Sequence, residues 1–181
     1  MNSATKNLEN DHVQILRLLD IMEEMTDNAN PEVSDLETVV SLIRNFADGF
    51  HHAKEEDILF PALALKGLSP YHGPVAVMLS EHTEGRNFVA GIARNIELYK
   101  NGDKGALEDV YKNMKGYIDL LRNHIAKENN ILFRMADNLL SETDHKELLQ
   151  RYSSVKSVTG SNNDPGKYIS EIDRLEKAYI A

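Results

Sequence analysis

A ten-residue motif that occurs twice constrains the fold of this chain more than any other feature. The stretch HHAKEEDILF at 51–60 returns as HIAKENNILF at 124–133, so both copies fit the pattern H-x-x-K-E-x-x-I-L-F. The ungapped alignment pairs His51, rather than His52, with His124. In each copy a glutamate follows the histidine by four positions, and side chains four positions apart lie on the same face of an α-helix. Each copy therefore predicts a helix that directs one imidazole and one carboxylate at a single point.

Hydrophobic residues recur every three or four positions along most of the chain, which is typical of amphipathic helices. No segment shows the alternation of a β-strand. The four longest periodic segments, separated by short stretches rich in turn-forming residues, are 8–22, 36–62, 75–96 and 107–135. Four helices of this length with short connections predict an all-α fold, an up-down antiparallel four-helix bundle.

The C-terminal part of the chain is organised differently. Ser141 and the acidic residues after it predict a capped short helix that runs to Tyr152. A loop is expected at 157–166. Apolar residues at helical spacing between Tyr168 and Tyr179 then predict a last amphipathic helix.

We therefore divide the 181 residues into a four-helix bundle at residues 1–140 and a helical extension at residues 141–181. The length is sufficient for one domain with a sizeable core. The extension is expected either to pack on the outside of the bundle or to form a homodimer, and the sequence favours neither outcome.

Composition excludes several classes of protein. The formal net charge is -9, which leaves no basic surface to neutralise phosphates, so we expect no nucleic-acid partner. The chain has no cysteine, so any metal must be held by nitrogen and oxygen. The N-terminus lacks an apolar signal core and no apolar run approaches transmembrane length, so we expect no membrane association and a cytoplasmic location.

Histidines lie on the inward stripe of all four predicted helices. His12 and His82, on the first and third helices, each follow an acidic residue, Asp11 and Glu81. The chain thus forms two helical hairpins with the pattern H … H-x-x-x-E. Pairing them about a pseudo-two-fold axis predicts a site for two metal ions, each with two histidines, and with both glutamates bridging between the ions. The predicted metal ligands are His12, His51, Glu55, His82, His124 and Glu128.

The alternative is a structural network of ion pairs in the bundle core. A single histidine on an apolar stripe is most often a packed core residue. Two buried glutamates, however, each cost on the order of several kcal/mol if they are unpaired. The nearest cations along the chain, Lys54 and Lys127, lie one position before each glutamate and hence on a different face. We therefore favour metal binding.

The type of ligand restricts the metal. Imidazole and carboxylate without sulfur suit iron, manganese or zinc. Paired glutamate and histidine inside a four-helix bundle form the arrangement of carboxylate-bridged di-iron sites. We expect two iron ions, and zinc and manganese stay open as alternatives.

The pattern formed by the six predicted ligands resembles the hemerythrin-like, or HHE cation-binding, family. The stretch HHAKEEDILFP at 51–61 is similar to that family's signature, and the resemblance covers residues 8–140. It implies an up-down four-helix bundle with a non-haem di-iron centre. The oxo- or hydroxo-bridged irons of this family bind small diatomic molecules, O2 or NO.

The chain departs from the invertebrate hemerythrins in two respects. Those proteins place two histidines one turn apart on the third helix and use five in all, whereas here the residues one turn from His82 are Met78 and Arg86. Their last helix uses H-x-x-x-x-D spacing, where this chain has H-x-x-x-E. An iron with fewer histidines has an open or water-filled position, which favours reaction with O2 over its reversible carriage.

Three further residues near the motif have weaker assignments. His52 is an extra ligand, a neighbour of the ligands or a surface residue, because an α-helix turns it about a quarter turn away from His51. Gly85 leaves room for a diatomic molecule or permits close packing of helices. Glu56 is expected on an exposed acidic face together with Asp57.

The expected function is that of a metal-binding protein that binds or senses O2 or NO, or reacts with peroxide. If the chain is an enzyme, we expect detoxification of peroxide or NO. The alternative, implied by some members of the family, is iron storage or iron donation for iron–sulfur cluster repair. The absence of cysteine weakens that alternative, since some repair proteins carry a cysteine-bearing accessory domain. All these functions need the same metal site, so the sequence does not separate them.

Overall fold

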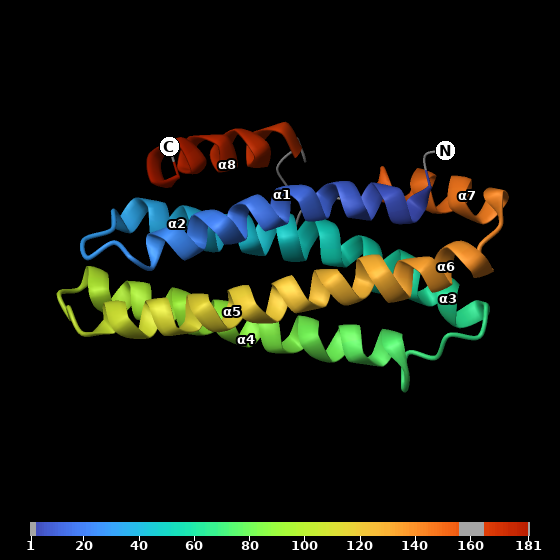
Figure 1. Ribbon diagram of the computed structural model, residues 1–181, viewed down its shortest axis with the longest axis horizontal. Coiled ribbons are helices and arrows are strands. Elements are labelled where there is room, and N and C mark those ends of the chain that lie inside the picture. Colours follow the sequence, from blue (N-terminus) through green and yellow to red (C-terminus); the bar gives the residue numbers. More distant parts are fainter. Residues whose placement is uncertain (1–2, 156–164, 181) are drawn as a thin grey trace.

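The computed structural model describes residues 3–155 and 165–180, and it is helical throughout, with no strand in these two ranges (Figure 1). This confirms the all-α prediction. The loop predicted at 157–166 lies outside the described residues, except that Pro165 and Gly166 begin the last helix. Among the described residues, no helix has both the length and the apolar character that crossing a membrane requires.

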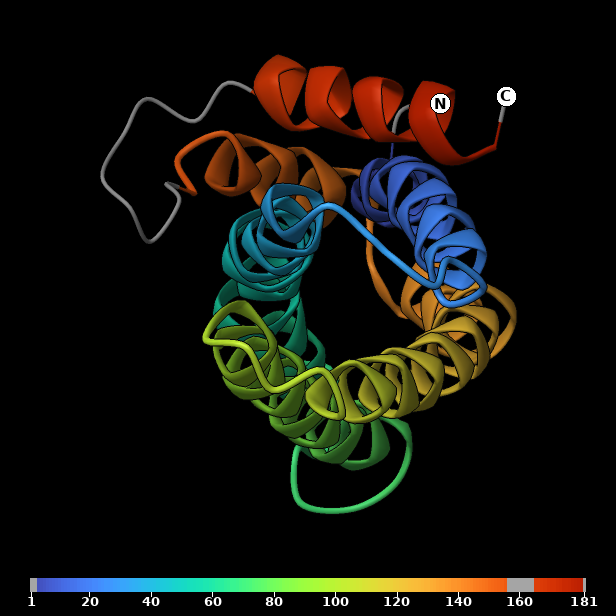
Figure 2. The same cartoon turned by 90° about the vertical axis from the view of Figure 1, so that its left-hand side faces the viewer.

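Four rods, each a run of consecutive helical segments, form an up-down antiparallel bundle (Figures 1 and 2). The first rod is α1 (Ala4–Met25) and the third is α4 (Pro74–Lys100). The second rod consists of α2 (Val33–Leu42), η1 (Ile43–His52), η2 (Glu55–Leu59) and α3 (Phe60–Leu65). The fourth rod consists of α5 (Ala106–Lys127), η3 (Glu128–Leu132) and α6 (Phe133–Leu139). Because α1 packs beside α5 and α2 packs beside α4, the rods close into the predicted bundle.

Local sequence signals set the ends of the rods. The side chain of Ser3 accepts a hydrogen bond from the backbone N–H of Lys6 and so caps α1. Pro74 lies in the first turn of α4, where a missing backbone N–H costs nothing. Gly102, with a φ of 103°, takes the left-handed conformation in the turn between α4 and α5, which glycine adopts without strain.

The second and fourth rods depart from regular α-helix where they carry the repeated motif. Segments η1, η2 and η3 have π-helical winding, in which each N–H donates to the carbonyl five residues earlier. The N–H of Phe60 thus donates to the carbonyl of Glu55, and that of Phe133 to the carbonyl of Glu128. A π turn holds more residues than an α turn, so neighbouring side chains are separated by a smaller rotation. His52 is therefore buried beside the ligands, and a position on the surface is ruled out.

The apolar core consists of two clusters, which lie on either side of His12 along α1. Ile15 and Phe46 belong to one cluster, and Leu8 and Phe133 belong to the other. Burial of these side chains is the main source of stability. The buried polar residues of the repeated motifs occupy the layer between the two clusters.

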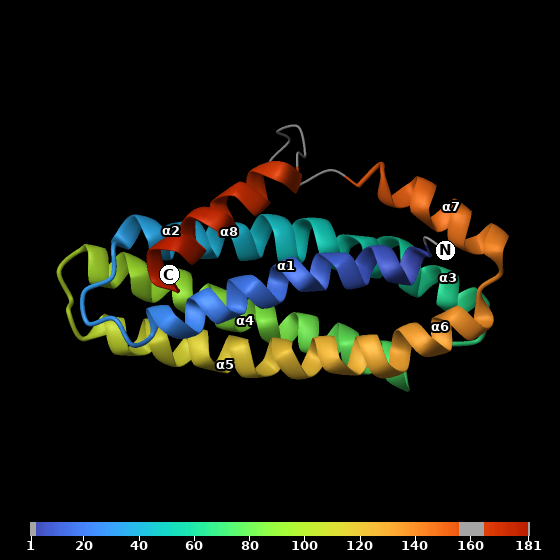
Figure 3. The same cartoon turned by 45° about the horizontal axis from the view of Figure 1, so that its top comes forward.

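Two helices of the extension pack on the outside of the bundle: α7 (Glu142–Tyr152) and α8 (Pro165–Tyr179) (Figures 2 and 3). Helix α7 begins with the predicted cap, in which Ser141 and Asp144 bond to each other's backbone N–H. Helix α7 contacts α1 and η2, while α8 lies along α1 and α2. One of the two expected roles of the extension is thus observed, and a homodimer stays a prediction.

The packing of α8 predicts that Leu175→Ala destabilises the whole protein. Leu175 is 0% exposed and belongs to the same apolar cluster as Ile15, so its truncation should cost about 2–5 kcal/mol. Chemical denaturation followed by circular dichroism measures the free energy of unfolding. Lys177→Ala, which changes an exposed residue of the same helix, is the control. Equal stabilities for the two variants would mean that α8 does not form part of the core.

Candidate metal centre

The bundle brings all the residues predicted as ligands together in its buried middle layer. Two groups form, and within each group one potential ligand atom per residue lies within 4.8 Å of all the others. The first group contains His12, His51, Glu55 and Glu128. The second group contains His52, Glu55, His82 and His124. The groups share Glu55, and the second includes His52, whose place the sequence left open.

Each helical hairpin supplies one close pair of imidazoles. The Nε2 atoms of His12 and His51 are 3.0 Å apart, and those of His82 and His124 are 3.1 Å apart. Two nitrogens bound at about 2.1 Å to one ion, at right angles to each other, lie about 3 Å apart. Both pairs therefore have the spacing that a shared cation requires.

The carboxylate of Glu128 faces both imidazole pairs. Its Oε2 atom lies 3.2 Å from Nε2 of His12, on the opposite hairpin, and 3.3 Å from Nε2 of His124, on its own rod. One oxygen thus lies between nitrogens of the two pairs, which is a bridging position.

The carboxylate of Glu55 is placed in the equivalent way by the other hairpin. Its Oε1 atom lies 3.6 Å from Nε2 of His51, and its Oε2 atom lies 3.5 Å from Nε2 of His82. Each oxygen therefore faces a different imidazole pair. The two glutamates are related by the same pseudo-symmetry as the two copies of the motif.

Neither glutamate forms a hydrogen bond with any described residue. Both side chains are 0% exposed, and all four of their carboxylate oxygens are buried without a partner of hydrogen-bond geometry in the described part of the chain. Burial and then the charge of Glu128 raise the pKa of Glu55 well above its usual value. Burial also opposes ionisation of Glu128, but the imidazoles of His124 and His12 outweigh it and lower its pKa. Two ionised carboxylates in this layer need cations beside them.

Two of the imidazoles are held in the form that binds metal. Burial lowers the pKa of both His51 and His52 well below the usual value, so both rings are neutral at neutral pH. A neutral ring with its proton on Nδ1 leaves the Nε2 lone pair free for a metal ion. The donors thus fit a pair of cations in number and in type.

Acidic residues that precede the first histidine of each hairpin hold the second histidine. Asp11 accepts a hydrogen bond from Nδ1 of His51 (3.3 Å) and another from Nζ of Lys54 (2.7 Å). Lys54 is buried and pairs with Asp11 rather than with the neighbouring Glu55. Asp11 therefore orients the ring of His51, not that of its neighbour in sequence.

The other hairpin repeats this arrangement. Glu81 accepts from Nδ1 of His124 (2.9 Å) and forms an ion pair with Lys127. The lysine of the repeated H-x-x-K pattern thus has the same task in both copies. The sequence showed the acidic residues and the lysines, but which histidine they serve depends on the register of helices far apart in the chain.

The residue after each bridging glutamate orients a histidine of the opposite hairpin. Asn129 lies 2.8 Å from Nδ1 of His12, and Glu56 lies 2.7 Å from Nδ1 of His82. Glu56 also pairs with Arg86 (2.7 Å). The expectation that Glu56 lies on an exposed acidic face is therefore wrong, because the pairing of the hairpins turns it toward His82. Its alignment with Asn129 in the repeat was the signal for this role.

His52 gives the second group an additional imidazole. The residue is 5% exposed, its Nδ1 atom lies 3.2 Å from Asp48, and its ring stacks on that of His82 with centroids 3.9 Å apart. Asp48 is held in turn by Arg86 at 2.7 Å. The second group thus has three imidazoles where the first has two.

The extension adds a buried phenol near the centre. Tyr152 of α7 is 3% exposed, and its hydroxyl has no hydrogen-bond partner among the described residues. Burial, followed by the charges of Glu55 and Asp11, raises its pKa. No sequence pattern predicts that this tyrosine lies near the centre, because its position depends on how α7 packs.

The carboxylates that hold the imidazoles predict a matched set of metal affinities. Asp11→Ala and Glu81→Ala should each weaken Zn2+ or Fe2+ binding about 10–100-fold. Asp11→Asn should lose less, because an amide oxygen can still accept from Nδ1, as Asn129 does for His12. Chelator competition measures these affinities, with Asp20→Ala, an exposed carboxylate on α1, as the control. Wild-type affinity in both alanine variants would contradict the orienting role.

Similarity to known proteins agrees with this site. The model of the hemerythrin HHE cation binding domain matches residues 3–136. The iron-sulfur cluster repair protein YtfE of Escherichia coli O157:H7 is 35% identical over 88 residues, which cover 48% of this chain and 40% of that protein. The uncharacterized protein Rv1995 of Mycobacterium tuberculosis strain H37Rv is 22% identical over 155 residues, covering 83% of this chain and 60% of that protein. The chain thus spans between two fifths and three fifths of these relatives. On the match from residue 3 to residue 136, it belongs to the hemerythrin HHE cation-binding domain family.

Proposed function

We propose that the centre holds two iron ions bridged by Glu55 and Glu128, with two histidines of one hairpin on each ion. One observation carries this proposal: two fully buried carboxylates have no hydrogen-bond partner in the described chain, yet each faces both imidazole pairs. The donors contain no sulfur, and their arrangement in a four-helix bundle favours iron over zinc and manganese. The proposed terminal ligands are His12 and His51 on the first ion and His82 and His124 on the second.

We further propose that His52 completes the second ion. Its ring belongs to the group formed with Glu55, His82 and His124, and Asp48 holds its Nδ1 side. This would restore a total of five histidines from a position unlike that used in the invertebrate proteins. The first ion, with two histidines, would then have the more open coordination.

Such a pair of irons, when bound, supplies a redox-active site that binds O2 or NO or reacts with peroxide, and we propose this as the function. The residues of the chain orient the imidazoles, whose Nδ1–H groups donate to Asp11, Glu81, Glu56 and Asn129, and they exclude bulk water. The two apolar clusters on either side supply that exclusion.

A second candidate is the storage of iron or its donation for iron–sulfur cluster repair. The similarity to the Escherichia coli iron-sulfur cluster repair protein YtfE, which is 35% identical over 88 residues, favours it. Transfer of iron from the loaded protein to a cluster-free acceptor protein would distinguish donation from the binding of gases. Stable retention of iron with reversible NO binding would favour the first function.

Elemental analysis of the purified protein is the direct test. We expect about two irons per chain, with near-ultraviolet absorption from an oxo bridge in air. Zinc alone, or no metal after folding with iron supplied, would overturn the redox function while leaving the fold intact.

The bridging role predicts that Glu55→Ala and Glu128→Ala each lose most of the bound iron. Each change removes a ligand that both ions share, so the loss should exceed that of one ion. Iron content and circular dichroism measure retention and folding, with the exposed residue change Glu23→Ala as the control. Nearly full iron content in both folded variants would refute the bridging assignment.

The role of His52 has its own test. His52→Ala should release the second iron more readily if the ring is a ligand, giving about one iron per chain after mild chelation. Asp48→Ala, which removes only the residue behind the ring, should have a smaller effect. Full retention of both irons in His52→Ala would place this histidine beside the ligands and not among them.

A further inference from the structure

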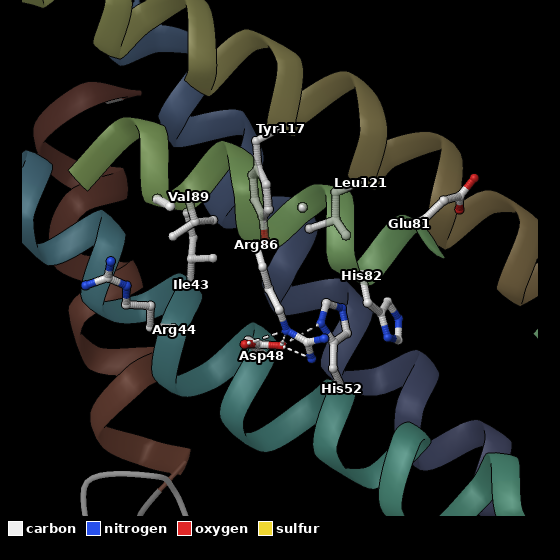
Figure 4. Close-up of a pocket in the computed structure, with 12 residues that line it drawn as sticks. Ile43, Arg44, Asp48, His52, Glu81, His82, Arg86, Val89, Tyr117 and Leu121 are labelled. Carbon is white, nitrogen blue, oxygen red and sulfur yellow. Dashed lines mark hydrogen bonds and ion pairs between the residues drawn. The ribbon is translucent and has the colours of Figure 1, made fainter. Parts of the chain in front are cut away.

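A cavity of about 120 Å³ lies next to the second group of histidines (Figure 4). Segment η1 and helices α4 and α5 form its wall. His52 and His82 lie at one end, and Val89 and Ile43 lie at the other. A single water needs about 10–15 Å³ of such space, so the cavity is large enough for several non-hydrogen atoms and exceeds the needs of a diatomic molecule.

The side chain missing at Gly85 keeps this cavity open. Gly85 is buried in the middle of α4, where glycine is less favourable than alanine by about 1 kcal/mol. A Cβ atom at Gly85 would meet the ring of Tyr117 at 3.5 Å, which is an ordinary contact. A Cβ at Gly116, by contrast, would clash with Phe88 at 2.4 Å. Close packing of helices therefore explains Gly116 but does not explain Gly85.

The charges around the cavity do not favour an anion. Arg86 is already held by Asp48 and Glu56, each at 2.7 Å. Arg44 also lines the cavity, but it lies at the end away from His52 (Figure 4). The acidic side chains of Asp48 and Glu81 belong to the lining as well. A neutral molecule would therefore enter at a lower electrostatic cost than a carboxylate or a phosphate.

The remaining wall is apolar. It consists of aliphatic side chains and the ring of Tyr117, which extends from α5 into the cavity in Figure 4. Pockets of this kind bind apolar groups and use a few polar atoms at one end to fix orientation. Here the polar atoms are those of the histidine end.

We propose that this cavity binds a small neutral organic molecule, with its apolar body against Ile43, Val89 and Leu121 and its polar end toward His52 and His82. The biological role of this binding rests on the proposed metal centre, because binding in the cavity would bring the polar end of the ligand to the second ion. The proposed ligand is larger than O2 or NO, and the cavity selects it by its shape and by its lack of charge.

Methyl NMR on the full-length protein, both metal-free and zinc-loaded, tests this with tert-butanol as the probe. Saturable shifts are expected at the methyl groups of Ile43, Val89 and Leu121. Pivalate, which has the same tert-butyl group on a carboxylate, should bind the metal-free protein at least about tenfold more weakly than tert-butanol does.

Two variants locate the binding site. Gly85→Leu should abolish the tert-butanol shifts by filling the cavity, and Gly85→Ala should weaken binding about tenfold. Ser80→Ala, an exposed change on the same helix, is the control and should bind as the wild type does. If Gly85→Leu does not fold, Gly85→Ala still decides, because its Cβ makes only ordinary contacts.

Three results would overturn the proposal: no saturable shift, tighter binding of pivalate than of tert-butanol to the metal-free protein, or binding unaffected in both Gly85 variants. None of these depends on iron. The iron content of the wild-type protein tests the proposed function separately. The proposed function and the proposed cavity ligand can therefore be refuted independently.

Discussion

The burial of two carboxylates among imidazoles is the constraint on which the rest of this structure depends. Glu55 and Glu128 lie where water does not reach, and no described residue forms a hydrogen bond with them. Apolar clusters on both sides fix the rods that carry them, so the carboxylates cannot relax toward solvent. The apolar clusters thus supply most of the stability of the fold. The buried carboxylates between them need cations nearby to balance their charge.

The centre is assembled by residues that work across the bundle. His12 is held by Asn129 and His82 by Glu56, and in both cases the partner lies on the opposite hairpin. A hairpin alone therefore carries ligands whose orientation is not fixed. Docking of the two hairpins aligns the imidazoles and brings the carboxylates between them, so a pre-organised site exists only in the complete bundle.

The sequence was sufficient for the fold class and for the residues that the bundle gathers at its centre, because both follow from helical period and from a motif repeated in register. It was insufficient wherever tertiary packing decides. The π-helical winding that turns His52 inward is not encoded by spacing. The pairing of Asp11 with His51 depends on the register of two helices, and the position of Tyr152 depends on the packing of α7.

The two halves of the centre are not electrostatically equal, although the sequence repeat relates them. Nδ1 of His12 faces the neutral amide of Asn129, whereas the rings of the second group face the carboxylates of Asp48, Glu56 and Glu81. Carboxylate partners make an imidazole a stronger electron donor. Two identical cations placed here would therefore meet donors of different strength, and the weakest of these donors would be the imidazole of His12. The repeat makes the two hairpins nearly equivalent. The amide of Asn129, at the position where the other copy has the carboxylate of Glu56, makes the two halves of the centre differ.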